Sequence, residues 1–260
     1  MGRELVTFTR PETSIFIAGM AATGFLLFNP LGTGLVYAFL AVFFLSAFGY
    51  SYNYLEDKKE DLLNNIKLNA FVTNGKGPLV AVSLLTVSFI FSLGLSRSAF
   101  WIFLISVPLT IAYSKYRIKE VFLLKNVYTG SVMALMFLIG ATTWHLPFKA
   151  LFYLPFVFVF GFVINLLGDI RGYRGDKAAG IKTVAVVLGP DATKKLIHFS
   201  VWAFIGATLF LNSALYPLLP FAFAISFFLE RNDLKKTRIC ILLSFMFLPV
   251  FLAITKVGVI

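Results

Sequence analysis

The sequence predicts an all-α integral membrane protein with nine transmembrane helices. Of its 260 residues, 59% are hydrophobic and only 13% are charged, which is far from the balance of an ordinary soluble domain. One stretch after another approaches the roughly 20 apolar residues that a helix needs to cross a bilayer. These stretches lack the alternating pattern of a membrane β-barrel, so their backbone should be helical.

Most of the predicted spans are joined by short connections. Breaks such as "NPLGTG" at 29–34 and "SRS" at 96–98 contain the Gly, Pro, Asn and Ser residues that interrupt helices. Three longer connections, at 53–77, 114–126 and 168–195, combine polar or charged residues with the end of a span. The nine spans are predicted at 13–28, 34–53, 78–95, 98–114, 122–140, 149–168, 194–212, 215–229 and 237–256.

The basic residues indicate how these spans are oriented. Cytoplasmic loops of membrane proteins are enriched in Lys and Arg, and all but three of the 23 basic residues fall on the side of the N-terminus. All twelve acids fall on that side too. We therefore predict a multi-pass protein of the cell membrane with a cytoplasmic N-terminus, an outer C-terminus and an active site at the cytoplasmic face. The three exceptions are Arg97, Lys149 and Lys256.

The net charge of +11 does not by itself indicate a nucleic-acid partner. A basic cytoplasmic rim facing anionic lipid is the ordinary state of a membrane protein with many spans. The single cysteine, Cys240, excludes an intrachain disulfide and lies within an apolar span. Charge and cysteine content therefore leave membrane lipids as the expected surroundings.

The stretch "NYLEDKKED" at 53–61 holds four of the twelve acids. Asn53, Asp57 and Asp61 are spaced i, i+4, i+8, so on a helix continuing from the second span they would line one stripe. Two carboxylates about 6 Å apart repel by roughly 3 kcal/mol at an effective dielectric constant near 20, which favours a cation between them. Oxygen ligands without Cys or His point to Mg²⁺. Alternatively, such a charge run is a solvated helix face with ion pairs four residues apart.

A second cluster repeats the pattern after the sixth span. Asn165 and Asp169 have the same spacing as Asn53 and Asp57, and Asp176 follows. Arg171 and Lys177 lie between and beside these acids. Carboxylates for a metal and cations for phosphate, in two copies on one side, are the parts of a site for a diphosphate.

The repetition extends beyond the acids. After a shift of three residues, "DLLNNIKLNAFV" at 61–72 aligns with "DKAAGIKTVAVV" at 176–187, sharing Asp, Ile-Lys, Ala and Val. We therefore predict an internal duplication of about four helices with both halves in the same orientation.

Further phosphate ligands are expected in the loops. The Ile-Lys pair of the first repeat contains Lys67, and the third long loop contains Tyr113, Lys119 and Lys125. Alternatively, the three lysines are present only because cytoplasmic loops are enriched in basic residues, and they bind no ligand.

These two motifs resemble those of the UbiA superfamily of intramembrane prenyltransferases. The first family motif, Asn-Asp-x-x-Asp-x-x-x-Asp, is similar to the stretch from Asn53 to Asp61, with Tyr54 where the second Asp often stands. The second is similar to "DIRGYRGDKAAGIKT" at 169–183, with Gly172 at the middle Asp. The resemblance covers nearly the whole chain and implies a single transmembrane prenyltransferase domain over 1–260. It also implies nine helices around a central cavity, with short cytoplasmic cap helices.

The resemblance implies a Mg²⁺-dependent transfer of a prenyl group from an isoprenyl diphosphate donor to a lipophilic acceptor. Ionisation of the donor would give an allylic carbocation in a dry chamber. Candidate acceptors are geranylgeranylglyceryl phosphate, a quinone-ring precursor and an isoprenoid. The catalytic acids would be Asp57, Asp61, Asp169 and Asp176, which would hold Mg²⁺ together with Asn53. The substrate would contact Asn165, Arg171, Lys177, Lys67, Tyr113, Lys119 and Lys125.

Two alternatives belong to other classes. A cation or phosphate transporter with a cytoplasmic acidic site would also use clustered acids, but transport favours ionisable residues near the bilayer midplane. A CDP-alcohol phosphotransferase resembles a different Asp motif, which this sequence lacks.

Overall fold

A computed structural model describes residues 2–58, 62, 67–142, 146–211 and 213–257, with the side chains of residues 119, 210, 211, 213 and 214 left undescribed. Throughout these residues the regular elements are helices, as predicted. Each predicted span overlaps a described helix, and most boundaries differ by a few residues. The predicted end of the sixth span at 168 is wrong, because α9 continues to Ala178 and so includes Asp169 and Asp176. These helices are α2 (Pro11–Phe28), α3 (Thr33–Glu56), α6 (Gly77–Ser92), α7 (Arg97–Lys115), α8 (Leu124–Ala141), α9 (Leu154–Ala178), α11 (Pro190–Leu211), α12 (Leu219–Glu230) and α13 (Leu234–Val257).

Six of the described helices are long and apolar enough to cross a membrane. They are α2, α3, α7, α8, α13 and α9 together with the 3₁₀ turn before it. Helices α6 and α12 are apolar but shorter, and α11 begins with a charged first turn.

Short helices lie between the long ones. Helix α1 (Gly2–Thr9) precedes α2, α5 (Ala70–Thr73) precedes α6, and α10 (Val184–Leu188) precedes α11. Three 3₁₀ helices complete the described elements: η1 (Ile118–Glu120), η2 (Phe148–Tyr153) and η3 (Ser213–Leu218).

The chain divides into two compact units. The first comprises Met1–Arg117 and Leu135–Pro147, and the second comprises Ile118–Ala134 and Phe148–Ile260. Helix α8 therefore contributes its first part to the second unit and its last part to the first unit.

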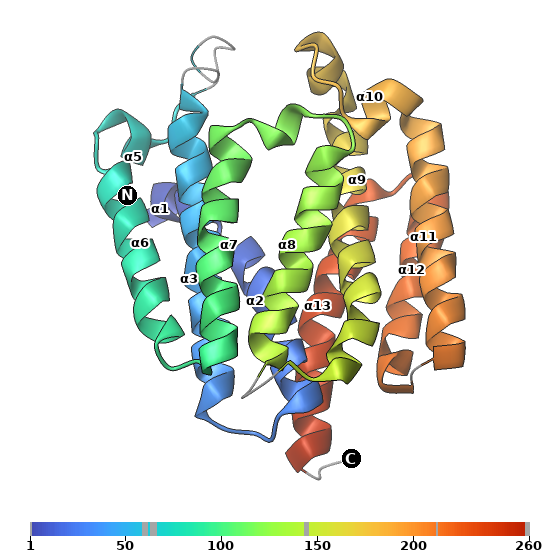
Figure 1. The fold of residues 1–260 in the computed structure, drawn as a ribbon. Helices are drawn as coiled ribbons and strands as arrows, with labels where there is room; N and C mark the ends of the chain where they lie inside the picture. Colours follow the sequence, from blue (N-terminus) through green and yellow to red (C-terminus); the bar gives the residue numbers. More distant parts are fainter. Residues whose placement is uncertain (1, 59–61, 63–66, 143–145, 212, 258–260) are drawn as a thin grey trace. The chain divides into compact units, whose positions relative to one another are not determined.

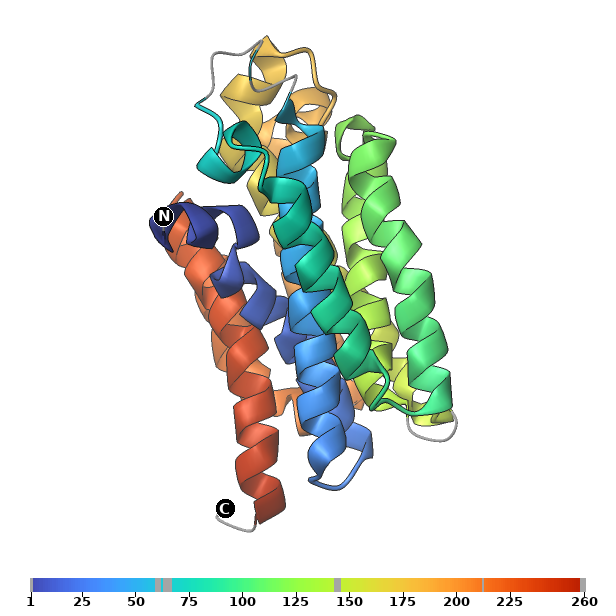
Figure 2. The ribbon, with the colours of Figure 1, turned by 90° about the vertical axis from the view of Figure 1, so that its left-hand side faces the viewer.

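Helix α3 is the centre of the first unit. It packs against both α2 and α6, and also contacts α7 (Figure 1, Figure 2). The face that it buries is formed mainly of small and medium-sized side chains, such as Ala38, Ala41, Val42 and Leu45. Small residues let helix backbones approach closely, which is how helices associate where lipid removes the hydrophobic driving force.

Backbones approach each other closely where α2 meets the last turns of α8. A Cβ atom added to Gly140 would lie 1.8 Å from the carbonyl oxygen of Ala21. One added to Gly24 would lie 2.1 Å from the carbonyl oxygen of Phe137. Asn29 fixes the same contact by donating a hydrogen bond of 3.1 Å to the carbonyl oxygen of Gly140. Glycine is required at both positions because backbone atoms occupy the space of a side chain.

The second unit is packed by larger side chains. Helix α9 contacts α10, α11 and α13, and α12 packs against α11 and α13. The ring of Phe160 on α9 meets Phe204 of α11 and Phe245 of α13 edge to face, at centroid distances of 5.0 and 5.5 Å. Aromatic pairs of this geometry add about 0.5–1.5 kcal/mol each beyond their buried area.

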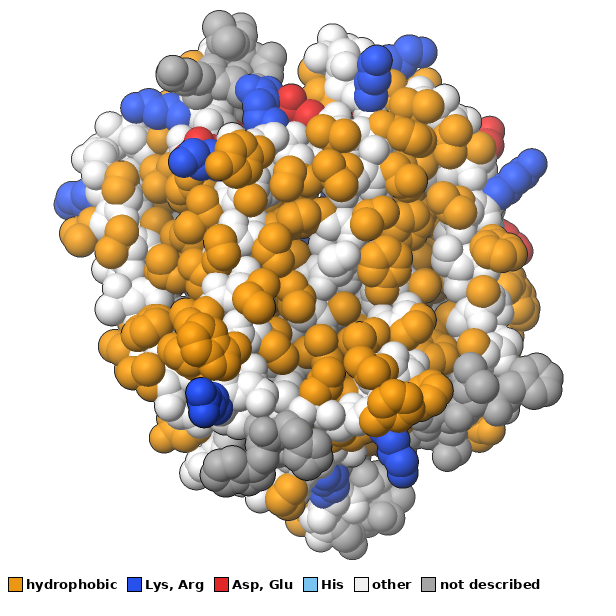
Figure 3. All heavy atoms as spheres, in the orientation of Figure 1, with side chains coloured by type: hydrophobic (Ala, Val, Ile, Leu, Met, Phe, Trp, Pro, Cys, Tyr) orange, Lys and Arg blue, Asp and Glu red, His pale blue; other side chains and the backbone are white. Residues whose placement is uncertain are grey.

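Outward-facing surfaces of the helices are apolar. Leu79 and Ile90 on α6 are 70% and 58% exposed, and Trp101 and Ile105 on α7 are each 55% exposed. Figure 3 shows hydrophobic side chains along the visible lengths of these helices. Such continuous exposure of large apolar groups is expected of helices that face lipid.

The Gly140 contact predicts the first outcome. We expect Gly140→Ala to lower the free energy of unfolding by about 1–3 kcal/mol, because the new methyl group meets backbone that cannot move aside. Thermal unfolding in detergent would measure this loss. Gly206→Ala on α11 is the matched control, because nothing lies within 4 Å of its added Cβ. Equal melting temperatures for the two variants would contradict the packing described.

Candidate functional site

The first acidic motif lies at the C-terminal end of α3. The amide Nδ2 of Asn53 donates a hydrogen bond of 2.7 Å to Oδ2 of Asp57. The Oδ1 atom of Asn53 accepts a hydrogen bond of 3.0 Å from Oγ of Ser114 on α7. Asn53 is thus held by a neighbouring helix and in turn orients the carboxylate of Asp57.

The end of α3 also sets the electrostatics of Asp57. Helix α3 ends at Glu56, and the backbone N–H of Asp57 donates to the carbonyl oxygen of Asn53 at 2.9 Å, so Asp57 is the C-cap. The C-terminal end of a helix carries partial negative charge, which disfavours a carboxylate and favours a cation beside it. The stripe predicted from Asn53 through Asp57 is present up to this point. Its continuation to Asp61 lies outside the described residues.

Tyr54 occupies the position at which the motif often has an acid. Its hydroxyl oxygen accepts a hydrogen bond of 3.1 Å from Nη2 of Arg10. The guanidinium carbon of Arg10 lies 5.2 Å from the ring centre of Tyr54 and 5.3 Å from that of Tyr50. Cation–π contacts of this kind stabilise by about 0.5–1 kcal/mol at exposed sites. Through these contacts Tyr54 on α3 holds Arg10 at the start of α2.

The second motif lies along the last turns of α9. Asn165, Asp169, Gly172 and Asp176 follow one another at intervals of four, three and four residues, so they share one face of this helix. A Cβ added to Gly172 would lie only 3.2 Å from Oδ2 of Asp176. The carboxylate of Asp176 therefore folds back over Gly172, into space that a side chain would occupy.

Helix α9 ends directly after Asp176 because of the residues that follow. Gly180 has a positive φ of 71°, and its N–H donates to the carbonyl oxygen of Lys177 at 3.3 Å. The N–H of Ile181 donates to the carbonyl oxygen of Asp176 at 2.9 Å. This pair of bonds is a Schellman motif, for which glycine is the preferred residue. The Gly-Ile pair of the sequence motif thus places Asp176 in the last turn of α9, at the negative end of that helix.

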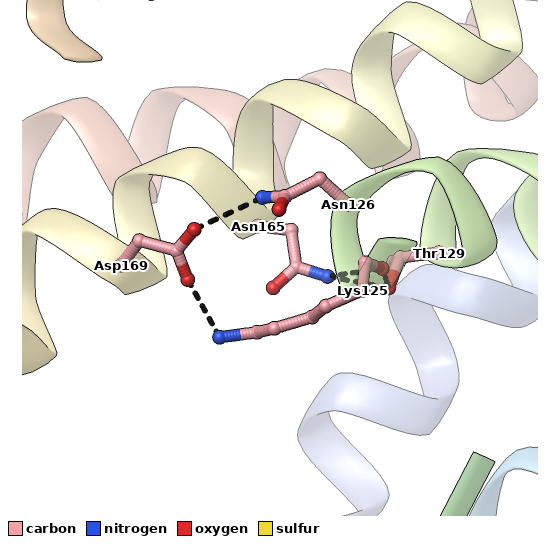
Figure 4. Close-up of polar contacts among 5 residues, drawn as sticks. All are labelled: Lys125, Asn126, Thr129, Asn165 and Asp169. Atoms are coloured by element: carbon pink, nitrogen blue, oxygen red, sulfur yellow. Dashed lines mark hydrogen bonds and ion pairs between the residues drawn. The ribbon is translucent and has the colours of Figure 1, made fainter. Parts of the chain in front are cut away.

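Asp169 has surroundings different from those of the other acids. It is fully buried, and its Oδ1 atom lies 2.6 Å from Nζ of Lys125. Its Oδ2 atom accepts a hydrogen bond of 3.1 Å from Nδ2 of Asn126 (Figure 4). Lys125 and Asn126 lie in the first turn of α8. Removing one member of such a buried pair costs about 3–5 kcal/mol, because the remaining charge lacks a counter-ion.

Asn165 ties α9 to the same turn of α8. Its Nδ2 atom donates to the carbonyl oxygen of Lys125 at 3.3 Å and also to Oγ1 of Thr129 (Figure 4). Asn165 and Asp169 together hold two successive turns of α9 against the start of α8. The sequence had predicted Asn165 as a substrate ligand, and its amide nitrogen is used here for this helix contact.

The other predicted ligands are distributed as follows. Arg171 and Lys177 are exposed on α9, and Nζ of Lys177 lies 3.4 Å from the hydroxyl oxygen of Tyr173. Lys67 is exposed just before α5, and Tyr113 is half-buried on α7. Lys119 belongs to η1, where only its backbone is described.

The structure thus groups Asn53 with Asp57, and Lys125 and Asn165 with Asp169. Sequence reasoning did not find Ser114, Asn126 or Thr129. Asn126 and Thr129 carried a usable signal, because they are polar residues one and four positions after Lys125 in the first turns of an apolar span.

The donor set suits a magnesium ion better than a softer metal. Asn53 and Asp57 in the first unit, and Asp176 in the second, each offer oxygen atoms, which are the ligands that Mg²⁺ prefers. Within the described part of the chain, no three His, Cys, Asp or Glu residues stand together as a complete metal site. Mg²⁺ usually binds one or two carboxylates and takes its remaining ligands from water and substrate phosphates. The residues present fit that mode of binding.

Comparison with known proteins places the chain in a class of membrane enzymes. The model of the UbiA prenyltransferase family matches residues 13–248. Comparison with curated protein sequences gave no significant match. The chain belongs to the UbiA prenyltransferase family and is a multi-pass integral membrane prenyltransferase.

Solved structures share its fold. A UbiA homolog from Archaeoglobus fulgidus bound to DMAPP and Mg²⁺ aligns with a TM-score of 0.77 at 18% identity, covering 98% of each chain. A UbiA homolog from Archaeoglobus fulgidus bound to GPP and Mg²⁺ aligns with a TM-score of 0.71 at 19% identity, covering 98% of this chain and 99% of that one. A digeranylgeranylglyceryl phosphate synthase aligns with a TM-score of 0.64 at 16% identity, covering 98% and 95%.

The contact between Gly172 and Asp176 predicts a second outcome. We expect Gly172→Ala to lower prenyltransferase activity about tenfold, because the added methyl group displaces the Asp176 carboxylate. Gly175→Ala is the matched control, since nothing lies within 4 Å of its added Cβ and the gain in helix propensity is the same. Initial rates of prenyl transfer would be compared. Equal rates for both variants would show that the position of Asp176 over Gly172 is unimportant.

Proposed function

We propose that the chain transfers a prenyl group from an isoprenyl diphosphate to a lipophilic acceptor within the membrane, in a Mg²⁺-dependent reaction. The observation that carries this proposal is the placing of Asp57 and Asp176. Each is a carboxylate at the C-terminal end of a long apolar helix, where a cation is favoured. The family assignment favours a transferase over the alternative of a cation or phosphate transporter.

Of the predicted metal ligands, Asp57, Asp61 and Asp176 are the proposed holders of the metal together with Asn53, which also orients Asp57. The remaining predicted ligand, Asp169, is paired with Lys125. When bound, Mg²⁺ would neutralise diphosphate oxygens and so make the diphosphate a better leaving group. Basic side chains would bind the remaining diphosphate oxygens and hold them in place. These side chains are Arg171, Lys177, Lys67, Lys119 and Lys125, with Tyr113 as a neutral donor. Asn165, the other predicted ligand, already donates its amide N–H groups to α8.

The chain's own contribution to the chemistry is electrostatic. Negative charge grows on the diphosphate as its bond to the allylic carbon breaks, so fixed cations that bind it more tightly at that stage lower the barrier. The allylic carbocation that remains reacts with water unless water is kept away. The apolar helices, in which nearly every ionisable group lies close to a helix end, provide such surroundings.

The solved structures support the choice of donor. Homologs with this fold bind DMAPP and GPP together with Mg²⁺. The acceptor candidates remain geranylgeranylglyceryl phosphate, a quinone-ring precursor and an isoprenoid, and the synthase with the same fold favours the first. Incubating the purified protein and Mg²⁺ with radiolabelled prenyl diphosphates and each acceptor would identify the product directly.

We also propose that the chain is one duplicated domain spanning 1–260. Asn53 and Asn165 are 112 residues apart. When 112 is added to its residue numbers, α2 covers 123–140, where α8 lies. Asp61 and Asp176 are 115 residues apart, three more than the two Asn residues. When 115 is added to their residue numbers, α5 and α6 cover 185–188 and 192–207, which lie within α10 and α11. The matching order of long and short helices supports the duplication predicted from the two Asn-x-x-x-Asp motifs.

The acid assignment predicts a third outcome. Asp57→Ala, Asp61→Ala and Asp176→Ala should each lower Mg²⁺-dependent diphosphate release about a hundredfold or more, because each removes a metal ligand. Glu56→Gln and Asp191→Asn serve as controls, since both acids are exposed and lie outside the two stripes. Enzyme activity would be measured alongside melting temperature to exclude misfolding. Unchanged turnover in all three Ala variants would refute the assignment.

The proposed orientation predicts a fourth outcome. In a variant with Cys240→Ser, a single cysteine introduced by Arg174→Cys should react with a membrane-impermeant maleimide only from the cytoplasm. A cysteine introduced by Lys149→Cys should react only from outside, because α9 separates the two positions. Labelling in intact cells and in inverted vesicles would measure this difference. The opposite pattern would overturn the orientation.

A further inference from the structure

We propose that Asp169 is a positioning residue for Lys125, which binds the donor diphosphate, and that Asp169 is not a ligand of the metal. This inference rests on the proposed function and changes the role of one acid of the second motif. Asp176 then remains as the metal-binding acid described on α9.

The first argument is that both oxygen atoms of Asp169 are already used. Lys125 occupies Oδ1 at 2.6 Å and Asn126 occupies Oδ2 at 3.1 Å. The short distance to Lys125 is typical of a charge-assisted bond. Since the ammonium and the amide come from adjacent residues of one helical turn, the carboxylate is fixed in rotation as well as in position.

The second argument is burial. Asp169 is 0% exposed, whereas Asp57 and Asp176 are both partly exposed. Mg²⁺ demands octahedral geometry and usually retains several water molecules, so it suits a carboxylate with open space around it. A divalent cation on Asp169 would also be repelled by the ammonium group of Lys125 on the same carboxylate.

The third argument is that Lys125 keeps N–H donors that Asp169 does not use. The ammonium group of Lys125 has three N–H donors, and Asp169 is its one hydrogen-bond partner within the described part of the chain. The Lys125 side chain keeps 19% of its surface exposed. Lys125 is also the second residue of α8, at the end of the helix where the helix dipole favours an anion. The remaining donors therefore suit a phosphate oxygen.

The buried carboxylate of Asp169 holds the ammonium group of Lys125 in a fixed position. Lysine is a flexible side chain with a compact charge, and binding a substrate normally requires that its freedom be lost first. The contact with Asp169 removes that freedom before the substrate arrives, as the catalysis of diphosphate departure requires. The missing middle acid at Gly172 agrees with a second motif that holds fewer metal ligands than the family pattern.

The test separates metal binding from diphosphate binding. Purified wild type, Asp169→Asn, Asp176→Asn and Lys125→Met would be compared in lipid nanodiscs. Mn²⁺ affinity without substrate would be measured by electron paramagnetic resonance. Affinity for an unreactive prenyl thiodiphosphate at saturating Mg²⁺ would be measured by calorimetry.

We expect Asp169→Asn to leave Mn²⁺ affinity within about twofold of wild type and to weaken thiodiphosphate binding about tenfold, since lysine contacts to phosphate are charge-assisted. Lys125→Met should do the same, whereas Asp176→Asn should weaken Mn²⁺ binding. Loss of Mn²⁺ affinity in Asp169→Asn equal to that in Asp176→Asn would overturn the inference. So would unchanged thiodiphosphate affinity in Lys125→Met.

A double variant keeps the test valid if one single variant misfolds. Lys125→Met leaves a buried carboxylate without its cation, so it should melt at a lower temperature than wild type. Combining it with Asp169→Asn removes both charges and should restore folding, with Mn²⁺ affinity kept and thiodiphosphate affinity still low. A restored double variant that binds thiodiphosphate as wild type does would reduce the pair to a structural role. Wild type that binds neither ligand would instead refute the proposed function.

Discussion

A hydrocarbon solvent offers no hydrogen bonds, and this constraint governs the whole protein. Every backbone group inside a membrane must be paired within the chain, which leaves the helix as the element for each span. Charged side chains are correspondingly costly away from the membrane surface. The two acids on which the proposed function rests accordingly lie at helix ends, where α3 ends at Asp57 and α9 ends just after Asp176.

Helix ends then determine which charges are useful. A carboxylate at a C-terminal end faces partial negative charge and gains from a cation, while a lysine in a first turn can serve an anion. Asp57 and Asp176 occupy the former position, and Lys125 occupies the latter. The same backbone that the membrane requires thus produces helix ends of opposite preference, one for a cation and one for an anion. Precise helix termination, such as the turn at Gly180, keeps each charge at its place.

The sequence was sufficient for features that depend on local pattern. The long helices followed from apolar length, and six of those described are long and apolar enough to cross a membrane. The Asn53–Asp57 contact followed from a spacing of one helical turn. Contacts between segments distant in sequence could not be predicted in this way. The pairing of Lys125 with Asp169 spans 44 residues, and that of Ser114 with Asn53 spans 61. No local rule connects them, because the packing of one helix against another decides which polar groups meet.

Departures from the family pattern show the same dependence on neighbours. Without coordinates, Tyr54 and Gly172 look like missing acids. In the structure the hydroxyl of Tyr54 accepts a hydrogen bond from Arg10. The absence of a side chain at Gly172 leaves room for the carboxylate of Asp176. An acid at Gly172 would meet the Asp176 carboxylate at close range and add like-charge repulsion. The role of a motif residue therefore depends on what surrounds it. One aspartate on α9 is half-buried in the last turn of the helix, and another, two turns earlier, is fully buried and neutralised by a lysine.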